Sequence, residues 1–283
     1  MKYLLILLIL NSIILAQEPV HSSVSTYYEN KTFSNSSQKT DGYVVGVGAD
    51  IHHSDSMYKF AYEHGDTNTR QPPLKDDLKV DKLFFRYGYE VSENLEFNLN
   101  YIYISDNIAI TDKGKAYAAG ISYKLNKKLS SNFTQFYSDY EDFNVYQSDL
   151  KIDFKMKLKK IKMKLSSITK YMYIDEENIN GFTKNAQKDY LTTGLKFHMH
   201  YDSYHFGGGA YFGKRAFGIM NDGFKIQHHA MEFDRTYAVG IGKNIDDFVV
   251  RLQYIYQRAI ELPLATKEHV TVSNFRLIAN YKF

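Results

Sequence analysis

The sequence predicts an all-β protein, a transmembrane antiparallel up-and-down β-barrel of about fourteen strands, with about twelve as the alternative count. Apolar and polar residues alternate with a period of two through most of the chain, which is the pattern of strands with one apolar face. From Ser92 onward the connections between these runs are alternately short and long, as in barrels with tight turns at one end. The runs average about ten residues, the length that a tilted strand needs to cross a bilayer.

Composition narrows the class of protein further. Although 44% of the 283 residues are hydrophobic and 16% are aromatic, the mean hydropathy is −0.42. No run of about 18 apolar residues follows the amino-terminal segment, which excludes a helical membrane protein. A barrel fits because only one face of each strand meets lipid. The net charge of +3 does not indicate a nucleic-acid partner, and the absence of cysteine excludes disulfides and thiolate metal sites.

The amino-terminal segment predicts a signal peptide over residues 1–16. Lys2 supplies a positive charge, residues 3–15 are mostly apolar, and Ala16 is a small residue suited to cleavage before Gln17. The alternative is a transmembrane anchor, but the segment is too short and no charged stop-transfer flank follows it. The sequence thus predicts an exported chain whose residues 17–283 form a single barrel domain.

About thirteen strands are predicted from Asp41 onward, separated by turns and polar loops. Their outward apolar faces begin at Tyr43, Tyr58, Leu83, Leu95, Tyr117, Leu129, Leu150, Ile161, Leu191, Tyr204, Met231, Phe248 and Phe275. Long loops are predicted at residues 65–79, 105–114, 175–188 and 213–227, and around Pro263. The first of these contains Pro72 and Pro73, which cannot donate to a strand ladder. The alternation changes phase near Ser167 and Ile168, which predicts a β-bulge.

The strand count depends on parity. Single-chain bacterial barrels have an even number of strands, so one more strand must precede Asp41. Residues 24–30 form a weak alternating segment that can supply it and would pair with the last strand. The alternative fold is a soluble β-sandwich or a lipocalin-like barrel, which would turn the apolar faces inward. The many long, regular strands and the predicted signal peptide disfavour that alternative.

The last strand carries a resemblance to a known group of proteins. Every second residue from Phe275 to Phe283 is apolar or aromatic, and the chain ends on an aromatic residue. This ending resembles the terminal strand of bacterial outer-membrane β-barrel proteins, in which Tyr281 and Phe283 would act as an assembly signal. The resemblance implies a place in the Gram-negative outer membrane, contact with its lipid and with the barrel-assembly machinery, and, by analogy with small porins, a monomer.

In such a barrel the polar phase of the strands faces the lumen, and here that phase is rich in cations. The lumen candidates are Lys151, Lys155, Lys157, Lys162, Lys164, Lys196, Arg251 and Arg276. One hypothesis is a field that draws anions toward this lysine-rich wall. The alternative is an ordinary solvated lumen in which the cations pair with Glu90, Glu96, Asp149 and Asp153. Tyrosines near the strand ends are expected to form aromatic girdles.

Three histidines predict a candidate metal site. His198 and His200 are two residues apart on one strand, so both face inward, and a turn at Asp202 and Ser203 would place His200 opposite His205. Imidazoles at this spacing suit a divalent transition metal. The alternative is that these histidines are simply tolerated near water. A weaker second cluster comprises His228, His229, Glu232 and Asp234.

The function that follows is a porin-like channel for passive diffusion of small hydrophilic solutes, anions among them. Residues 213–227, with Lys214 and Arg215, are the predicted constriction loop. The alternative function is a non-conducting barrel with a structural, adhesion or enzymatic role. No spacing of serine, histidine and acidic residues indicates a catalytic triad, so no enzymatic activity and no cofactor are expected.

Overall fold

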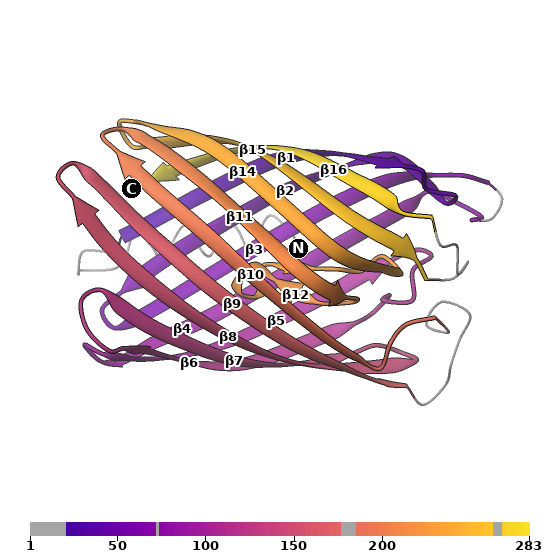
Figure 1. Ribbon diagram of the computed structural model, residues 1–283, viewed down its shortest axis with the longest axis horizontal. Helices are drawn as coiled ribbons and strands as arrows, with labels where there is room; N and C mark the ends of the chain where they lie inside the picture. Colours follow the sequence, from indigo (N-terminus) through magenta and orange to yellow (C-terminus); the bar gives the residue numbers. More distant parts are fainter. Residues whose placement is uncertain (1–20, 72–73, 177–184, 263–267) are drawn as a thin grey trace, which may run out of the picture.

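The computed structural model describes residues 21–71, 74–176, 185–262 and 268–283. Across these residues, fourteen antiparallel strands close into a tilted barrel in which β1 pairs with β16 (Figure 1). The barrel strands are β1 (His21–Ser34), β2 (Lys39–His53), β3 (Ser56–Thr69), β4 (Leu78–Ser92), β5 (Leu95–Asp106), β6 (Lys115–Lys124), β7 (Leu129–Asp139), β8 (Phe143–Leu158), β9 (Ile161–Glu176), β10 (Asp189–Tyr201), β11 (Tyr204–Arg215), β14 (Met231–Ile245), β15 (Phe248–Glu261) and β16 (Val270–Lys282). The predicted fold class and the higher of the two strand counts are confirmed.

Some predictions fall on residues outside the described ranges. These are the signal peptide over residues 1–16 and the loop positions of Pro72, Pro73 and Pro263. Within the described ranges, no helix is long and apolar enough to cross a membrane.

The first strand closes the barrel. Residues 24–30 lie within β1, which pairs with β2 on one side and with β16 on the other, so the prediction of a strand here is confirmed. Its polar composition follows from its alternation: Val24 and Tyr28 are exposed on the outer surface, whereas Glu29 and Lys31 in the opposite phase are buried in the lumen. Such a strand gives only a weak hydrophobic pattern in the sequence, because every second side chain points into the lumen and is polar.

The outer surface of the barrel is an apolar band. Predicted outward residues are exposed, for example Val47 at 55% and Leu195 at 67%. A closed barrel leaves no unpaired strand edge, and together with an apolar outer band this is what a bilayer requires of spanning strands. A row of tyrosine rings crosses β5 to β9 and comprises Tyr101, Tyr117, Tyr137, Tyr146 and Tyr173. This row has the cross-strand arrangement expected of an aromatic girdle.

Short turns join the strands at one end of the barrel, here called the turn end. The turns between β2–β3, β4–β5, β8–β9, β10–β11 and β14–β15 have two residues each. The carboxyl terminus lies at the same end, where the Phe283 N–H donates to the carbonyl oxygen of Ser22 at 2.9 Å and the Tyr281 and Phe283 rings are 5.0 Å apart.

The connections at the opposite end differ in part from the predicted loops. Only residues 140–142 join β7 to β8, so this connection is short where a long one was expected. The reason is that β8 begins at Phe143, before Leu150, where its alternation of apolar and polar residues becomes clear. Strand β3 extends to Thr69, so the predicted loop at residues 65–79 starts too early. Polar residues continue a strand there because they face the lumen or the barrel rim.

The inward phase is not uniformly polar, which corrects the sequence prediction. Strand β9 keeps an unbroken register with β8 and β10, so the bulge predicted near Ser167 and Ile168 is absent. Ile168 is instead an inward residue, 5% exposed. Buried apolar residues occupy the half of the lumen away from the turn end, and the strands contribute Leu78, Val80, Phe84, Ile102, Ile104, Phe136, Val145, Met172 and Ile174.

The irregularities lie on β11 and β14. The register shifts between Phe212 and Arg215, and again between Phe233 and Arg235. The second shift reverses the phase of β14, so Met231 and Phe233 face inward rather than outward as predicted. After Arg235 the residues predicted to face outward do so, and Val239 is 60% exposed.

Candidate functional site

Residues 216–230, which connect β11 to β14, form what we call the inserted segment. It contains β12 (Ile219–Met220), η1 (Asn221–Gly223) and β13 (Lys225–Ile226), and it folds back into the lumen (Figure 1). Its tip turns tightly, with positive φ at Asn221 (52°), Asp222 (55°) and Gly223 (97°). These are the residue types that adopt the left-handed conformation at least cost.

Aromatic contacts attach the inserted segment to the wall. Phe217 is fully buried, with its ring 4.8 Å from that of Phe143 and 6.4 Å from that of Tyr140. On the other side of the tip, the Phe224 ring lies 6.1 Å from that of Phe84. The apolar residues in the inward phase of β4 to β9 are therefore the surface on which this segment packs.

Hydrogen bonds fix the backbone of the inserted segment at one residue. The Gln147 side chain donates from Nε2 to the Ile219 carbonyl oxygen at 2.7 Å and accepts from the Ile219 N–H at 2.8 Å. The Lys170 ammonium donates to the same carbonyl at 3.0 Å and is also paired with Asp149. Because all of these groups are buried, the bonds satisfy polar atoms that would otherwise be costly.

The tip of the inserted segment is held by charge. Asp222 pairs with Lys151 at 2.8 Å, and Lys196 donates to the Asn221 Oδ1 at 3.2 Å. Burial alone would raise the pKa of Asp222, but Lys151, Lys196 and Arg86 together outweigh it and lower the pKa to about 2. Two of the predicted lumen cations, Lys151 and Lys196, are therefore engaged by a segment of the chain itself.

A second group of buried charges lies near the closing seam. Glu29, 1% exposed, pairs with Arg276, with Lys31 at 3.8 Å and with Lys225 of the inserted segment at 3.7 Å. Arg276 was predicted as a lumen cation, and it faces inward, but its charge is neutralised by Glu29. Burial lowers the pKa of Lys225 despite the neighbouring Glu29 carboxylate.

The remaining predicted lumen cations differ in whether a carboxylate pairs with them. Lys164 pairs with Asp153 at 3.9 Å. Within the described part of the chain, no carboxylate forms an ion pair with Lys155, Lys157, Lys162, Lys196 or Arg251. The first three are exposed beside the β8–β9 turn, so they lie at one side of the mouth of the lumen at the turn end.

Lys214 and Arg215 do not lie in the loop for which they were predicted. Both belong to the end of β11, because this strand continues through the bulge that begins after Phe212. Lys214 pairs with Glu232 at 2.9 Å. Arg215 is fully buried, with its guanidinium 5.5 Å from the Phe233 ring, so it presents no free charge to a solute.

A cavity of about 390 Å³ runs between the inserted segment and the wall formed by β11 and β14. The inward residues of that wall include Gly207, Gly209, Gly240 and Gly242, here called the glycine wall. A Cβ atom at Gly207 would meet no atom closer than 3.8 Å, so space rather than crowding lies in front of it. Cations line the cavity, among them the predicted lumen residues Lys151, Lys164, Lys196, Arg251 and Arg276.

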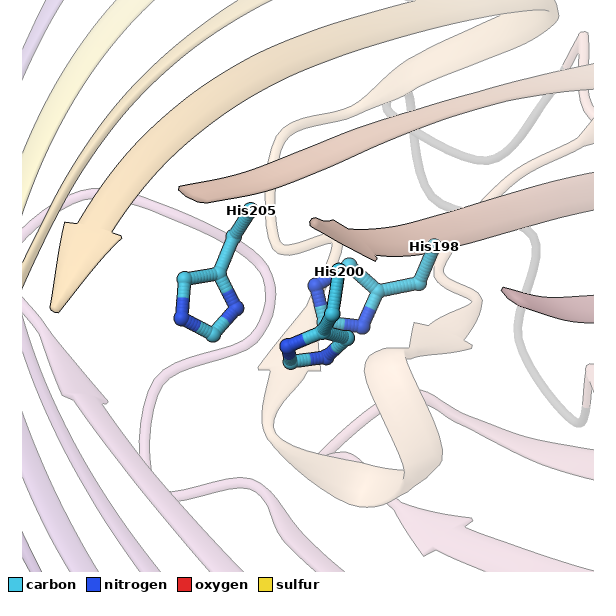
Figure 2. Close-up of side chains that lie close together, drawn as sticks. All are labelled: His198, His200 and His205. Carbon is cyan, nitrogen blue, oxygen red and sulfur yellow. The ribbon is translucent and has the colours of Figure 1, made fainter. Parts of the chain in front are cut away.

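The histidine hairpin has the predicted register. His200 lies opposite His205 and His198 lies opposite Gly207, and the three rings gather at the lumen side of β10 and β11 (Figure 2). One ligand nitrogen from each ring lies within 4.8 Å of the others, and among the described residues this is the one group of three or more candidate ligands that gathers so closely.

The second histidine cluster does not assemble as a group with its acidic neighbours. His228 and His229 are buried, with ring centroids 4.1 Å apart, and burial lowers the pKa of both well below the ordinary value. Glu232 pairs with Lys214, and Asp234, at the bulge, pairs with Arg258. The change of phase at the bulge separates these carboxylates from the histidines.

Sequence reasoning missed the residues that hold the inserted segment in place: Gln147, Lys170, Asp222 and Lys225. The signal that could have found them is the group of apolar residues in the inward phase of β4 to β9. A water-filled lumen gives no reason for buried Phe136 or Met172 there, so their presence indicates that another part of the chain fills that half.

No protein-family model matches the sequence, and no curated protein is similar to it. Solved structures are similar in fold. The chain resembles a structure described as a bacterial polysaccharide outer membrane secretin, with a TM-score of 0.57 at 7% identity, covering 93% of this chain and 98% of that one.

Two hydrocarbon transport proteins are also similar. The Ralstonia pickettii toluene transporter TbuX gives a TM-score of 0.56 at 10% identity, covering 95% of this chain and 90% of that one. The CymD monoaromatic hydrocarbon channel gives 0.58 at 9% identity, covering 95% and 89%. The closed barrel with its apolar outer band, together with these neighbours, shows that the chain has the fold of a porin-like barrel of the cell outer membrane.

Proposed function

We propose that this protein is an outer-membrane channel through which small hydrophilic solutes, preferentially anions, diffuse passively. The observation that carries the proposal is the cavity of about 390 Å³ along the glycine wall, which would give solutes a route beside the inserted segment. Two of the similar structures are described as a toluene transporter and a hydrocarbon channel, which supports transport rather than catalysis for a barrel of this shape.

Charge supports a preference for anions. Lys155, Lys157 and Lys162 lie together at one side of the mouth at the turn end, and Arg251 on β15 has a buried Nε without a hydrogen-bond partner. Low-dielectric walls focus the field of such cations, so anions are concentrated in the lumen and cations are repelled. By analogy with other barrels that end on an aromatic residue, the turn end would face the periplasm. The barrel-assembly machinery would insert the chain as a monomer after recognising Tyr281 and Phe283.

The inserted segment would set the width of the route. Its tip is tied to the wall by Asp222 and Asn221 and its backbone by Gln147, and these polar contacts add to the aromatic packing of Phe217 and Phe224. Loss of those contacts would widen the lumen, because the segment lies between β8 and the glycine wall.

The alternative is a non-conducting barrel with a structural or adhesive role. One observation favours it: buried apolar residues pack the inserted segment against β4 to β9 in the half away from the turn end. Both functions predict the same fold but differ in whether ions cross.

Recordings from the purified barrel in planar lipid bilayers separate the two. The channel predicts stepwise ionic current from the wild-type chain and larger steps when residues 219–226 are replaced by a short glycine–serine linker. The control is the same protein denatured by heat before addition. Absence of steps in the wild type, with steps appearing only after the replacement, would establish the non-conducting alternative.

A further inference from the structure

The β10–β11 hairpin brings three imidazoles together because of its tight turn. Asp202 has a φ of 53°, which a two-residue hairpin turn needs, and the resulting register sets His200 opposite His205. His198 is two residues from His200 and therefore on the same inward face. Its cross-strand neighbour is Gly207, so no side chain separates the His198 ring from the other two.

The distances are close to those of a metal site. The ring centroid of His200 lies 4.3 Å from that of His198 and 4.1 Å from that of His205. One ligand nitrogen from each ring lies within 4.8 Å of the others. Zinc binds imidazole nitrogen at about 2.0–2.1 Å, so tetrahedral ligand nitrogens are about 3.4 Å apart. Rotation of the two partly exposed rings, His198 and His200, can close the remaining gap.

The third ring is already oriented as a ligand. His205 Nε2 is hydrogen-bonded to Asn244 Oδ1, and since a carbonyl oxygen can only accept, Nε2 carries the proton. Nδ1 is then unprotonated, and it is buried without a hydrogen-bond partner. Figure 2 shows one nitrogen of His205 turned toward the other two rings and the other turned away. An outer hydrogen bond that fixes the tautomer of a histidine is typical of metal sites.

Asn244 is itself held in place by the hairpin. Its backbone N–H donates to the carbonyl oxygen of Ser203, in the β10–β11 turn, at 2.7 Å. The turn that aligns the histidines therefore also aligns the group that orients His205. A buried imidazole nitrogen left without a partner carries a cost in a structure that satisfies its neighbours, and a metal ion would remove that cost.

The ligand atoms, rather than the surrounding charge, decide which cation fits. The nearby charges are cations, among them Lys162, Lys164, Arg251 and Lys282, and none of the three ligands is a carboxylate. Hard cations such as Ca²⁺ and Mg²⁺ need oxygen ligands, whereas Zn²⁺, Cu²⁺ and Ni²⁺ bind neutral imidazole. The positive surroundings weaken the binding of any of these ions without changing that preference.

We propose that His198, His200 and His205 bind one divalent transition-metal ion of the imidazole-preferring class at the turn end of the lumen, with Asn244 as a positioning residue. The remaining coordination positions of the ion would face the lumen. Metal binding at this site does not require ion conduction, so its test is independent of the test of the proposed channel.

The test is titration of the full-length, folded barrel, without a polyhistidine tag, with Zn²⁺ by calorimetry and with Cu²⁺ by electron paramagnetic resonance. The expected result is one ion per chain, with nitrogen couplings on Cu²⁺ and no binding of Ca²⁺. His200→Ala is expected to weaken binding by about tenfold or more, the effect typical of changes at metal sites. The control, His52→Ala with His53→Ala, removes two exposed histidines at the same end and should leave the affinity unchanged.

A variant of the positioning residue tests the orientation of His205. Asn244→Leu keeps all three ligands but removes the acceptor for Nε2, so it should weaken binding severalfold while leaving the number of ions per chain unchanged. His198→Gln serves as a second ligand variant, and heat-dependent gel migration checks that each variant is a closed barrel. Wild-type protein that binds no ion, binding unaffected in both ligand variants, or loss of binding in the His52 and His53 control would each overturn the proposal.

Discussion

Gln147 on β8 makes two hydrogen bonds with the backbone of Ile219 in the inserted segment, donating to its carbonyl oxygen at 2.7 Å and accepting from its N–H at 2.8 Å. Ile219 pairs with Ile226 across the β12–β13 ladder, and the Gln147 amide occupies the place of a second neighbouring strand on the other side of β12. The inserted segment is therefore bound to the barrel wall at its backbone, independently of its own side chains.

Removal of the two hydrogen bonds between Gln147 and Ile219 should loosen the inserted segment. Gln147→Leu keeps the approximate size of the side chain but leaves the Ile219 N–H without its partner, and a buried unpaired group costs about 1–3 kcal/mol. In bilayer recordings we expect more frequent fluctuations between current levels and a larger mean current. Gln135→Leu on the neighbouring strand β7 is the control, because Gln135 bonds to Ser148 on the barrel surface. Equal behaviour of the two variants would contradict the role of Gln147.

The tip of the inserted segment should respond to acid. The pKa of Asp222 is lowered from 3.8 to about 2 when it is docked beside Lys151. A carboxyl group whose pKa falls on docking stabilises the docked state fully above its ordinary pKa and loses that effect as the pH falls through the docked value. The current is therefore expected to change between about pH 4 and about pH 2.

Asp222→Asn isolates this effect from other carboxylates. The variant lacks the charge at every pH, so its current at neutral pH should resemble that of the wild type in acid, and the acid-induced change should be much smaller. An acid response of the same size in the variant would show that other groups are responsible.

The seam charges should matter for stability. Glu29 is the shared partner of Arg276, Lys31 and Lys225, so Glu29→Gln leaves buried cations unpaired, which typically costs about 3 kcal/mol or more. Urea unfolding in lipid vesicles, followed by tyrosine fluorescence, measures the free energy of unfolding. Glu90→Gln is the matched control, since its pair with Lys124 is half-exposed at 52% and 48% and should contribute little. An equally small loss for Glu29→Gln would contradict the importance of the seam charges.

The glycine wall should define the route of the solute. At Gly207 an added Cβ would make only ordinary van der Waals contacts, none closer than 3.8 Å, so Gly207→Phe should fold and place a ring in the cavity, reducing the current several-fold. Val239→Phe adds similar bulk on the neighbouring strand, but its side chain faces outward and is 60% exposed, so the current should not change. A full wild-type current in the Gly207→Phe barrel would mean that ions pass elsewhere.

Much of the barrel can be predicted from alternation because each spanning strand meets two different solvents. The period of two locates β10 and β11 and the turn between them, and the opposition of His200 and His205 follows from that turn. The strand around Val24 can be inferred although its pattern is weak, because a closed barrel needs an even number of strands and a partner for the last one. These inferences use only local geometry and a count.

The packing inside the lumen could not be predicted in the same way. Alternation alone predicts a polar inward phase, and the burial of Ile102 and Met172 follows only from the packing of the inserted segment on that half of the lumen. The bulge after Phe233 depends on one extra residue, Asp234, which no periodicity identifies. The sequence predicts a loop at Arg215 because the irregular backbone after Phe212 interrupts the alternation of β11.

The most direct test of the account is the reversal potential of the wild-type channel in a gradient of potassium chloride across the bilayer. The cations without carboxylate partners at the turn end predict a reversal potential of the sign that chloride selectivity gives. Replacing Lys155, Lys157 and Lys162 by glutamine should move it toward zero, whereas Lys127→Gln with Lys128→Gln, in the β6–β7 turn, should not. A reversal potential of the sign for potassium selectivity in the wild type would contradict the central claim.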